Sequence, residues 1–271
     1  MKTKFLITSL LLILLTSCSS DNDNNTDDGN EVPTEFMPLK NSNFWTYNVD
    51  SDISSSINPL TRDSIYVSGD TLINSVTYKK IKSLTIPTGF FSSTLRNNGI
   101  KIDGSKLLMT GNFSFDFGLT SPINLGVTDF IFFKENATVG QVLSTASGTI
   151  NQTVQTYPLT IDYTLKSVYN GSQATYVFPN GDDYNDIRKT KIILNLKITT
   201  VQTLSGVTFP ITIMNAQDVI VSDQFYSKNV GMIYANTVLN YQLNSIPNVT
   251  LPIPSTFSQT QTESINSFLI N

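Results

Sequence analysis

The chain of 271 residues contains no histidine and a single cysteine, Cys18. Without histidine it lacks the commonest metal ligand and the side chain that titrates near neutral pH unaided. Zinc sites of His and Cys, Ser-His-Asp triads and Cys-His pairs are therefore excluded. Any catalysis would have to use carboxylates, Lys or Tyr. Because no second thiol exists, no disulfide can form within the chain, and the core depends on burial alone.

Charge is scarce and unevenly placed. The chain carries 17 basic and 21 acidic residues, for a net charge of −4. The stretch after the cysteine is acidic, with Asp21, Asp23, Asp27, Asp28, Glu31 and Glu35. From Phe36 onward the two signs balance, and no basic patch of the kind that binds nucleic acid is visible. We therefore expect no nucleic-acid partner.

Long apolar runs are confined to the N-terminus. Lys2 and Lys4 precede an apolar segment at 5–15, which is shorter than the ~20 residues that a membrane-spanning helix needs. A basic start, a short apolar core and small residues before a processing point are typical of a secretory signal peptide. The sequence therefore predicts a signal peptide over residues 1–17.

The end of that segment resembles the bacterial lipobox: Leu15, Thr16 and Ser17 are followed by Cys18. The resemblance implies a diacylglyceryl thioether on Cys18 and, after cleavage, a further acyl chain such as palmitate on its amino group. Two or more acyl chains anchor a protein stably to a membrane. Residues 18–35 are then a flexible acidic tether, since they are too polar to bury much surface.

From Phe36 onward the pattern is that of β-strands, because apolar and polar residues alternate with a period of two. The longest rows are Leu159, Ile161, Tyr163 and Leu165; Ile192, Leu194, Leu196 and Ile198; and Val207, Phe209, Ile211 and Ile213. The last two rows flank Ser205-Gly206 and predict a long hairpin. Further strands are expected around Trp45 and Phe113 and at 63–67, 76–84, 129–133, 219–225 and 232–243.

Helical spacing is scarce. Ile265, Phe268 and Leu269 have i, i+3, i+4 spacing, and Thr260 with Glu263 could form a capping box before them. We expect a short C-terminal helix there. The fold class is all-β and mainly antiparallel, as a single curved sheet that is half-barrel or sandwich-like. Residues 36–271 fit one β-rich extracytoplasmic domain, with a split near Gly148 left open.

The densest acidic cluster of the domain is Asp182, Asp183 and Asp186, in the stretch NGDDYND at 180–186. One interpretation is a weak calcium site, or a carboxylate pair of the kind that glycoside hydrolysis requires. The other is a polar turn, which the Asn-Gly-Asp sequence favours. No other acid is placed by the sequence to partner the cluster. We favour the turn and predict neither a metal nor a cofactor.

Three further features have alternative interpretations. Trp45 could stack on a sugar, but its alternation with Tyr47 and Val49 favours the core. The row Phe113, Phe115 and Phe117 could line a lipid cavity or simply fill the core. Ser227 and Lys228 are adjacent and would point to opposite faces of a strand, so they make a poor catalytic pair. Gly231 suggests a bend or a close backbone approach.

Five short stretches occur in order along the domain: PLKNSNFWTYNV at 38–49, GDTLINSVTYKKIKS at 69–83, TLRNNGIKI at 94–102, ATVGQV at 137–142 and YSKNVGMIY at 226–234. Together they resemble a broad group of uncharacterised secreted proteins and lipoproteins of Bacteroidetes-type bacteria. The resemblance implies a curved, mostly antiparallel sheet and no catalytic residues. Ser42 and Ser75 stand where the group has Gly, and Ser75 is the less comfortable residue for a type I′ turn.

The acidic stretch after Cys18 is also similar to signals that such bacteria use for display on the outer face of the outer membrane. We therefore expect a non-enzymatic lipoprotein of the outer membrane, facing the cell surface. Its partners would be the membrane, through the anchor, and an extracellular ligand or envelope protein. The alternatives are a hydrophobic-ligand or lipid-binding half-barrel, acting as carrier or receptor, and a carboxylate-based glycan hydrolase.

Overall fold

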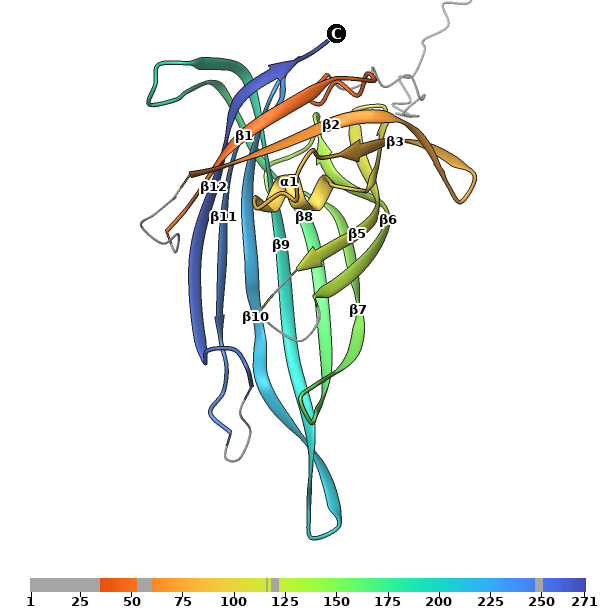
Figure 1. Cartoon of the computed structure of the whole chain (residues 1–271), viewed down its shortest axis with the longest axis vertical. Helices are drawn as coiled ribbons and strands as arrows, with labels where there is room; N and C mark the ends of the chain where they lie inside the picture. The colour runs from red at the N-terminus through yellow and green to blue at the C-terminus, as the bar shows by residue number, and fades with distance from the viewer. Residues whose placement is uncertain (1–34, 53–59, 116, 118–121, 247–250) are drawn as a thin grey trace, which may run out of the picture. The chain divides into compact units, whose positions relative to one another are not determined.

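The computed structural model in Figure 1 describes residues 35–52, 60–115, 117, 122–246 and 251–271. The predicted signal peptide, the lipobox at Leu15, Thr16 and Ser17, the lipidation site Cys18 and the tether up to residue 34 lie outside the described residues. Glu31–Asn271 forms one compact unit, and this unit contains a hydrophobic core of its own. We therefore expect it to fold without residues 1–30.

The described chain forms one sheet of twelve antiparallel strands, so the predicted all-β fold class is confirmed. The strands are β1 Phe44–Ser51, β2 Leu60–Ile73, β3 Val76–Lys82, β4 Gly99–Asp103, β5 Lys106–Phe115, β6 Ile123–Lys134, β7 Val142–Val154, β8 Tyr157–Val177, β9 Asp183–Leu204, β10 Val207–Ser227, β11 Gly231–Gln242 and β12 Thr256–Leu269. One short helix, α1 Phe90–Leu95, is present among these residues. Gly148 lies inside β7, opposite Tyr163, in the continuous sheet.

Every strand pairs with its neighbour in sequence except at one seam. The order is β6-β5-β4-β3-β2-β1-β12-β11-β10-β9-β8-β7, so the first and last strands pair and β6 and β7 are the edges. The sheet curls until these edges approach each other (Figure 1). The buried Ser167 hydroxyl of β8 donates a hydrogen bond to the Ile131 carbonyl of β6. The sheet is therefore nearly closed, with β6 against the inner face of β8.

The concave side of the sheet holds the core because the period-two rows turn their apolar residues inward. Leu194 and Leu196 of β9 are 0% and 1% exposed. Trp45 of β1 is also fully buried, and its Nε1 donates a hydrogen bond of 2.6 Å to the Val230 carbonyl. The core interpretation of Trp45 is therefore confirmed.

Gly231 makes that contact possible. It has a φ of +114°, and a Cβ at this position would lie 3.1 Å from the Trp45 Nε1 atom. A side chain would therefore be strained by the backbone and would press on the indole ring. The close backbone approach that the sequence suggested at Gly231 is confirmed.

The predicted hairpin turns form as expected. Ser205 and Gly206 join β9 to β10 with φ values of 52° and 82°. Asn74 and Ser75 join β2 to β3 with φ values of 50° and 66°. Both residues of each turn have the positive φ that a type I′ hairpin requires. Ser75 therefore adopts a conformation that Gly would adopt at lower cost.

The predicted C-terminal helix is wrong. The segment is strand β12, which pairs with β11 on one side and with β1 on the other. Two ladders of hydrogen bonds outweigh a weak helical spacing, because a short helix would leave the facing edges of β1 and β11 unpaired. The inner row of β12 contains Gln259, Gln261, Glu263 and Ile265. Glu263, expected to cap a helix of its own, instead caps α1.

Candidate ligand-binding site in the concave face

A hollow of about 280 Å³ lies beside α1 on the inside of the sheet. Its walls come from the segment leading into α1 and from β5, β10, β11 and β12. The polar side chains in these walls carry hydroxyl or amide groups, and the other side chains are apolar. The lining residues are Thr88, Phe90, Ser93, Ser114, Phe115, Phe117, Ile220, Thr237, Leu239, Gln259 and Gln261. This hollow can offer hydrogen bonds but no charged side chain.

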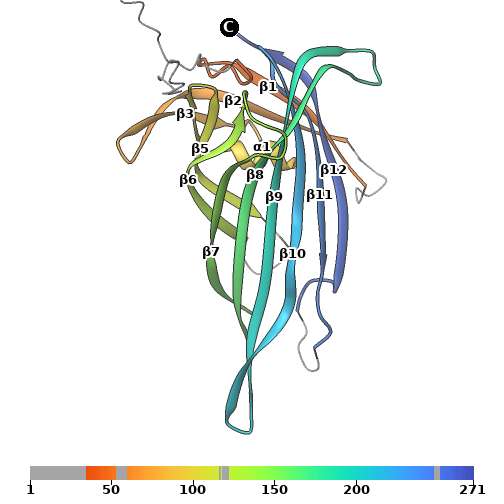
Figure 2. The same ribbon diagram turned by 180° about the vertical axis from the view of Figure 1, so that it is seen from behind.

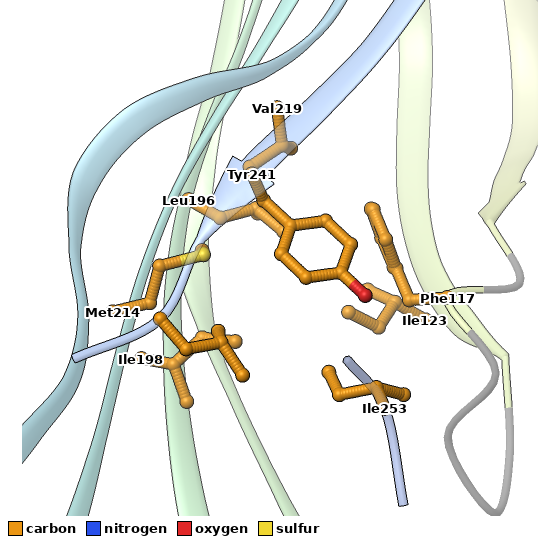
Figure 3. Close-up of a pocket in the computed structure, with 9 residues that line it drawn as sticks. Phe117, Ile123, Leu196, Ile198, Met214, Val219, Tyr241 and Ile253 are labelled. Carbon is orange, nitrogen blue, oxygen red and sulfur yellow. The ribbon is translucent and has the colours of Figure 1, made fainter. Parts of the chain in front are cut away.

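The next hollow along the interior is small, about 20 Å³, and apolar. Figure 3 shows the Tyr241 hydroxyl directed into the space between Phe117, Ile123 and Ile253. Burial raises the pKa of this hydroxyl above its ordinary value. The remaining walls are Leu196, Ile198, Met214, Val219 and Leu243. Phe117 lines both this hollow and the one beside α1, so the two adjoin.

A third hollow, of about 550 Å³, lies at the connection between β11 and β12. Leu243 and Ile253 line it as well as the small apolar hollow. Ile213, Ile246 and Leu251 add apolar surface, and the other half of the lining is polar: Gln242, Asn244, Ser245, Ser255 and Thr256. The three hollows therefore form a row from α1 to the β11–β12 connection, which we term the interior groove. Ligand pockets in proteins commonly occupy about 300–1,000 Å³.

Two buried carboxylates hold α1 at the upper end of this groove. The Glu263 carboxylate accepts hydrogen bonds from the Phe91 and Ser92 backbone N–H groups, at 2.5 and 3.1 Å, and from the Ser92 hydroxyl at 2.8 Å. Asp63 accepts the Thr88 N–H at 3.0 Å and the Gly89 N–H at 2.7 Å. These donors are the unpaired N–H groups that begin a helix.

Gly89 lets the Glu263 side chain approach this closely. A Cβ on Gly89 would lie 2.2 Å from the Glu263 Cδ and Oε2 atoms. Gln261, one step along the same inner row of β12, accepts the Phe90 N–H at 2.8 Å and donates to the Thr88 carbonyl at 3.0 Å. The segment entering α1 is thus bound by β2 and β12 side chains, and α1 forms a fixed wall of the groove.

Burial is the main electrostatic influence on Glu263. It raises the pKa of the carboxyl to about 7, against the opposing effect of the hydrogen bonds from Ser92 and Phe91, and the nearby Asp63 charge raises it further. Burial, followed by the Glu263 charge, also raises the pKa of Tyr47 and Tyr226. Tyr47 donates to the Met232 carbonyl and Tyr226 to the Gln224 side chain.

The Asp63–Glu263 pair matters for the glycan-hydrolase alternative, which requires two carboxyl groups on either side of one bond. Each oxygen of both carboxylates already accepts a hydrogen bond from the α1 segment. Neither residue lines any of the three hollows. The contacts of this pair are those of groups that position α1.

Asp182 lies in the connection between β8 and β9, and Asp183 and Asp186 lie at the start of β9. Asp182 accepts a hydrogen bond from the Asn180 amide and donates its backbone N–H to the Asn180 side chain, in the pattern of a polar turn. Asp186 pairs with Arg188 at 2.5 Å. Asp182 and Asp183 are exposed, and no group of three acidic, His or Cys side chains that could hold a metal occurs within the described ranges.

The other predicted features are dispersed. Phe113 and Phe115 are buried and stack at 6.1 Å. Phe113 lines none of the three hollows, whereas Phe115 and Phe117 line the hollow beside α1. Ser227 donates to the Asn185 carbonyl, and Lys228 pairs with Glu35 at 3.3 Å. Ser227 and Lys228 thus have separate partners.

Sequence reasoning missed the polar residues of β12. Gln259, Gln261 and Glu263 follow one another at a period of two, between Phe257 and Ile265 in the same row. A polar run inside an inward-facing row is a signal for a buried polar site, because such groups are costly to bury without partners. The helical spacing of the last residues concealed that row.

No helix in the described part of the chain is long and apolar enough to cross a membrane. Comparisons with protein-family models, with curated proteins and with solved structures found no match for this chain.

Proposed function

We propose that this chain is a lipid-anchored, non-catalytic binding protein of the cell envelope, and that its interior groove holds an elongated amphipathic molecule such as a fatty acid or lipid. The apolar part of the ligand would lie against Ile213, Leu251 and Ile253 in the largest hollow, and the narrow hollow of about 20 Å³ would have to widen for the ligand to pass. Its polar head would face the hydroxyls and amides beside α1. Such a ligand matches a groove that is apolar in its narrow middle and has hydroxyls and amides at both ends.

The observation that carries this proposal is the row of adjoining hollows inside a nearly closed sheet. The hollow beside α1 and the hollow at the β11–β12 connection measure about 280 and 550 Å³, and each shares lining residues with the small apolar hollow between them. The inventory supports a non-catalytic role, since the chain has no histidine and both buried carboxylates are engaged with α1.

The ligand is tested on the mature-length chain that starts at Ser19 and therefore lacks Cys18. We expect native mass spectrometry to detect a co-purified lipid, and radiolabelled palmitate to bind the delipidated protein. Leu239→Trp, which fills the hollow beside α1, should weaken palmitate binding by about tenfold, a free-energy change of about 1.4 kcal/mol. Ile253→Trp should do the same from the apolar side.

The matched control is Leu72→Trp, because Leu72 is 72% exposed at the β2–β3 turn and lines none of the hollows. Its palmitate affinity should equal that of the parent chain. Absence of any bound lipid, or equal affinities for all three variants and the parent, would contradict the groove as a ligand site.

The anchor is tested separately in cells. The lipobox residues Leu15, Thr16 and Ser17 support lipidation of Cys18, so Cys18→Ala should release the protein from the membrane fraction. Protease added to intact cells should digest the wild-type protein if it faces the cell surface from the outer membrane. Membrane retention of Cys18→Ala would overturn the anchor, and complete protection from protease would overturn surface display.

A further inference from the structure

Charged residues are absent from three long stretches of the chain, at 136–161, 198–217 and 229–262. Each stretch contains a connection between two strands: β7–β8 at 155–156, β9–β10 at 205–206 and β11–β12 at 243–255. Because neighbouring strands are antiparallel, the three connections lie at the same end of the sheet (Figures 1 and 2). We term this the uncharged end.

The opposite end of the same strands is charged. The β8–β9 connection has Asp182, Asp183 and the Asp186–Arg188 ion pair close by, and the β10–β11 connection has Lys228 paired with Glu35. Both ends consist of hairpin connections, where exposed charges are ordinarily tolerated without cost. The lack of charge at the β7–β8, β9–β10 and β11–β12 connections is therefore not a consequence of burial.

The uncharged end also exposes apolar side chains. Around the β9–β10 turn, Val207 is 65% exposed, Val201 48% and Phe209 36%. In both views this hairpin reaches beyond the β7–β8 connection (Figures 1 and 2). Charged side chains on exposed strands ordinarily prevent those strands from associating with other molecules. This hairpin has exposed apolar side chains and no charged ones. Exposed apolar side chains also occur elsewhere, as at Val177, which is 64% exposed, so the absence of charge is what distinguishes this hairpin.

The interior groove opens beside this hairpin. Ile213 of β10, Leu251 and Ile253 line its largest hollow. The Asn244 side chain donates to the Thr212 carbonyl at 2.9 Å, and this contact holds Asn244 against β10. The exposed hairpin and the largest hollow therefore share strand β10.

We propose that the uncharged end docks on a lipid bilayer, with Val207 and Phe209 at the level of the headgroups and upper acyl chains. Charged side chains are the most costly groups to bring into a bilayer, and this end has none within its three stretches. Binding sites for protein partners more often have a rim of polar residues around their apolar centre, and this rim orients the two proteins. Transfer of a lipid from that bilayer into the groove rests on the proposed function. The docking itself does not.

The test uses the mature-length chain from Ser19, which has no lipidation site, and vesicles of phosphatidylcholine. We expect the chain to sediment with the vesicles at low and high salt alike, because no ion pair is involved. Val207→Glu should weaken vesicle binding by at least about tenfold. The control is Val177→Glu on the opposite β8–β9 hairpin, since Val177 and Val207 are almost equally exposed, at 64% and 65%. It should bind like the parent chain.

Phe209→Trp provides a second readout. The parent chain has one tryptophan, Trp45, which is fully buried. Vesicles should therefore change the fluorescence of the added tryptophan and leave that of Trp45 unchanged. A blue shift on adding vesicles is expected, since Trp favours the membrane interface. No binding, equal losses for Val207→Glu and Val177→Glu, or no blue shift would overturn the proposal. Self-association that Val207→Glu abolishes without any vesicle binding would overturn it too, and would identify a second copy as the occupant.

Failure of this inference is distinguishable from failure of the proposed function. Palmitate binding in the absence of vesicles reports on the groove alone, and we expect Val207→Glu to leave it unchanged. A chain that binds palmitate but not vesicles would contradict the docking inference only. A chain that binds vesicles but not palmitate would contradict the proposed ligand only.

Discussion

The Glu263 carboxylate of β12 accepts the backbone N–H of Phe91 in α1 at 2.5 Å, although the two residues are 172 positions apart in the chain. Both are buried, at 1% and 2% exposure. The contact joins the last strand to the helix inside the sheet, so the wall of the groove beside α1 is assembled only when the C-terminal strand is in place.

Removing this carboxylate should destabilise the protein. Glu263→Gln places an amide NH₂ among the N–H donors of Phe91 and Ser92 and leaves at least one of them unpaired. A buried unsatisfied donor costs about 1–3 kcal/mol, and we expect a loss of that size in urea denaturation above the folded-state pKa of about 7, where Glu263 is ionised. Asp103→Asn is the control, because Asp103 is exposed at the end of β4. An equal loss for both variants would show that the α1 contact contributes nothing specific.

Glu263 should also make stability depend on pH. Its folded-state pKa of about 7 is above the ordinary value of 4.5, so the folded state holds a proton that the unfolded state has already released. The stabilisation is fully present below about pH 4.5 and is lost as pH rises toward about 7, with a total on the order of 3 kcal/mol. Urea denaturation across this pH range measures it.

The comparison that isolates this effect is the same pH series on Glu263→Gln, which cannot ionise at this position. The difference in unfolding free energy between the parent chain and Glu263→Gln should be largest at the acidic end of the range. Parallel pH profiles for the two proteins would mean that Glu263 titrates at the same pH in the folded and unfolded states.

Gly231→Ala should disturb the Trp45 contact. The added Cβ meets a positive φ of +114° and lies 3.1 Å from the Trp45 Nε1 atom, so we expect a loss of about 1–3 kcal/mol from strain and steric contact. Gly181→Ala separates the two causes, because Gly181 has a φ of +94° but no atom within 4 Å of the place that a Cβ would take. Only Gly231→Ala should change the emission of Trp45.

Ser75→Gly should stabilise the β2–β3 hairpin. Ser75 has a φ of 66° in a turn where Asn-Gly is the preferred pair, and relief of the left-handed conformation is worth about 1 kcal/mol. Thermal denaturation should show a higher Tm. Ser147→Gly, at an exposed position in β7, should have the opposite sign, because Gly in a strand interior loses more backbone entropy. A lower Tm for Ser75→Gly would contradict the turn assignment.

The strands were predictable because their signal is local. Alternation at 192–198 and 207–213 specifies which face of each strand is apolar, and Ser205-Gly206 specifies the turn between them. The end of the chain was not predictable in this way. Ile265, Phe268 and Leu269 fit a helix by spacing, and the strand that forms instead depends on β1, more than 200 residues earlier in the chain, as in the Trp45–Phe268 pairing.

Composition and local pattern are properties of the residues alone: no histidine, one cysteine in a lipobox-like context, period-two strands, turn pairs and three stretches without charge. How these parts act together depends on the fold. Pairing of β1 with β12 places Glu263 against α1, the curl of the sheet leaves adjoining hollows inside it, and the antiparallel order gathers the uncharged connections at one end. These outcomes depend on contacts between residues far apart in the chain, which no local period or spacing encodes.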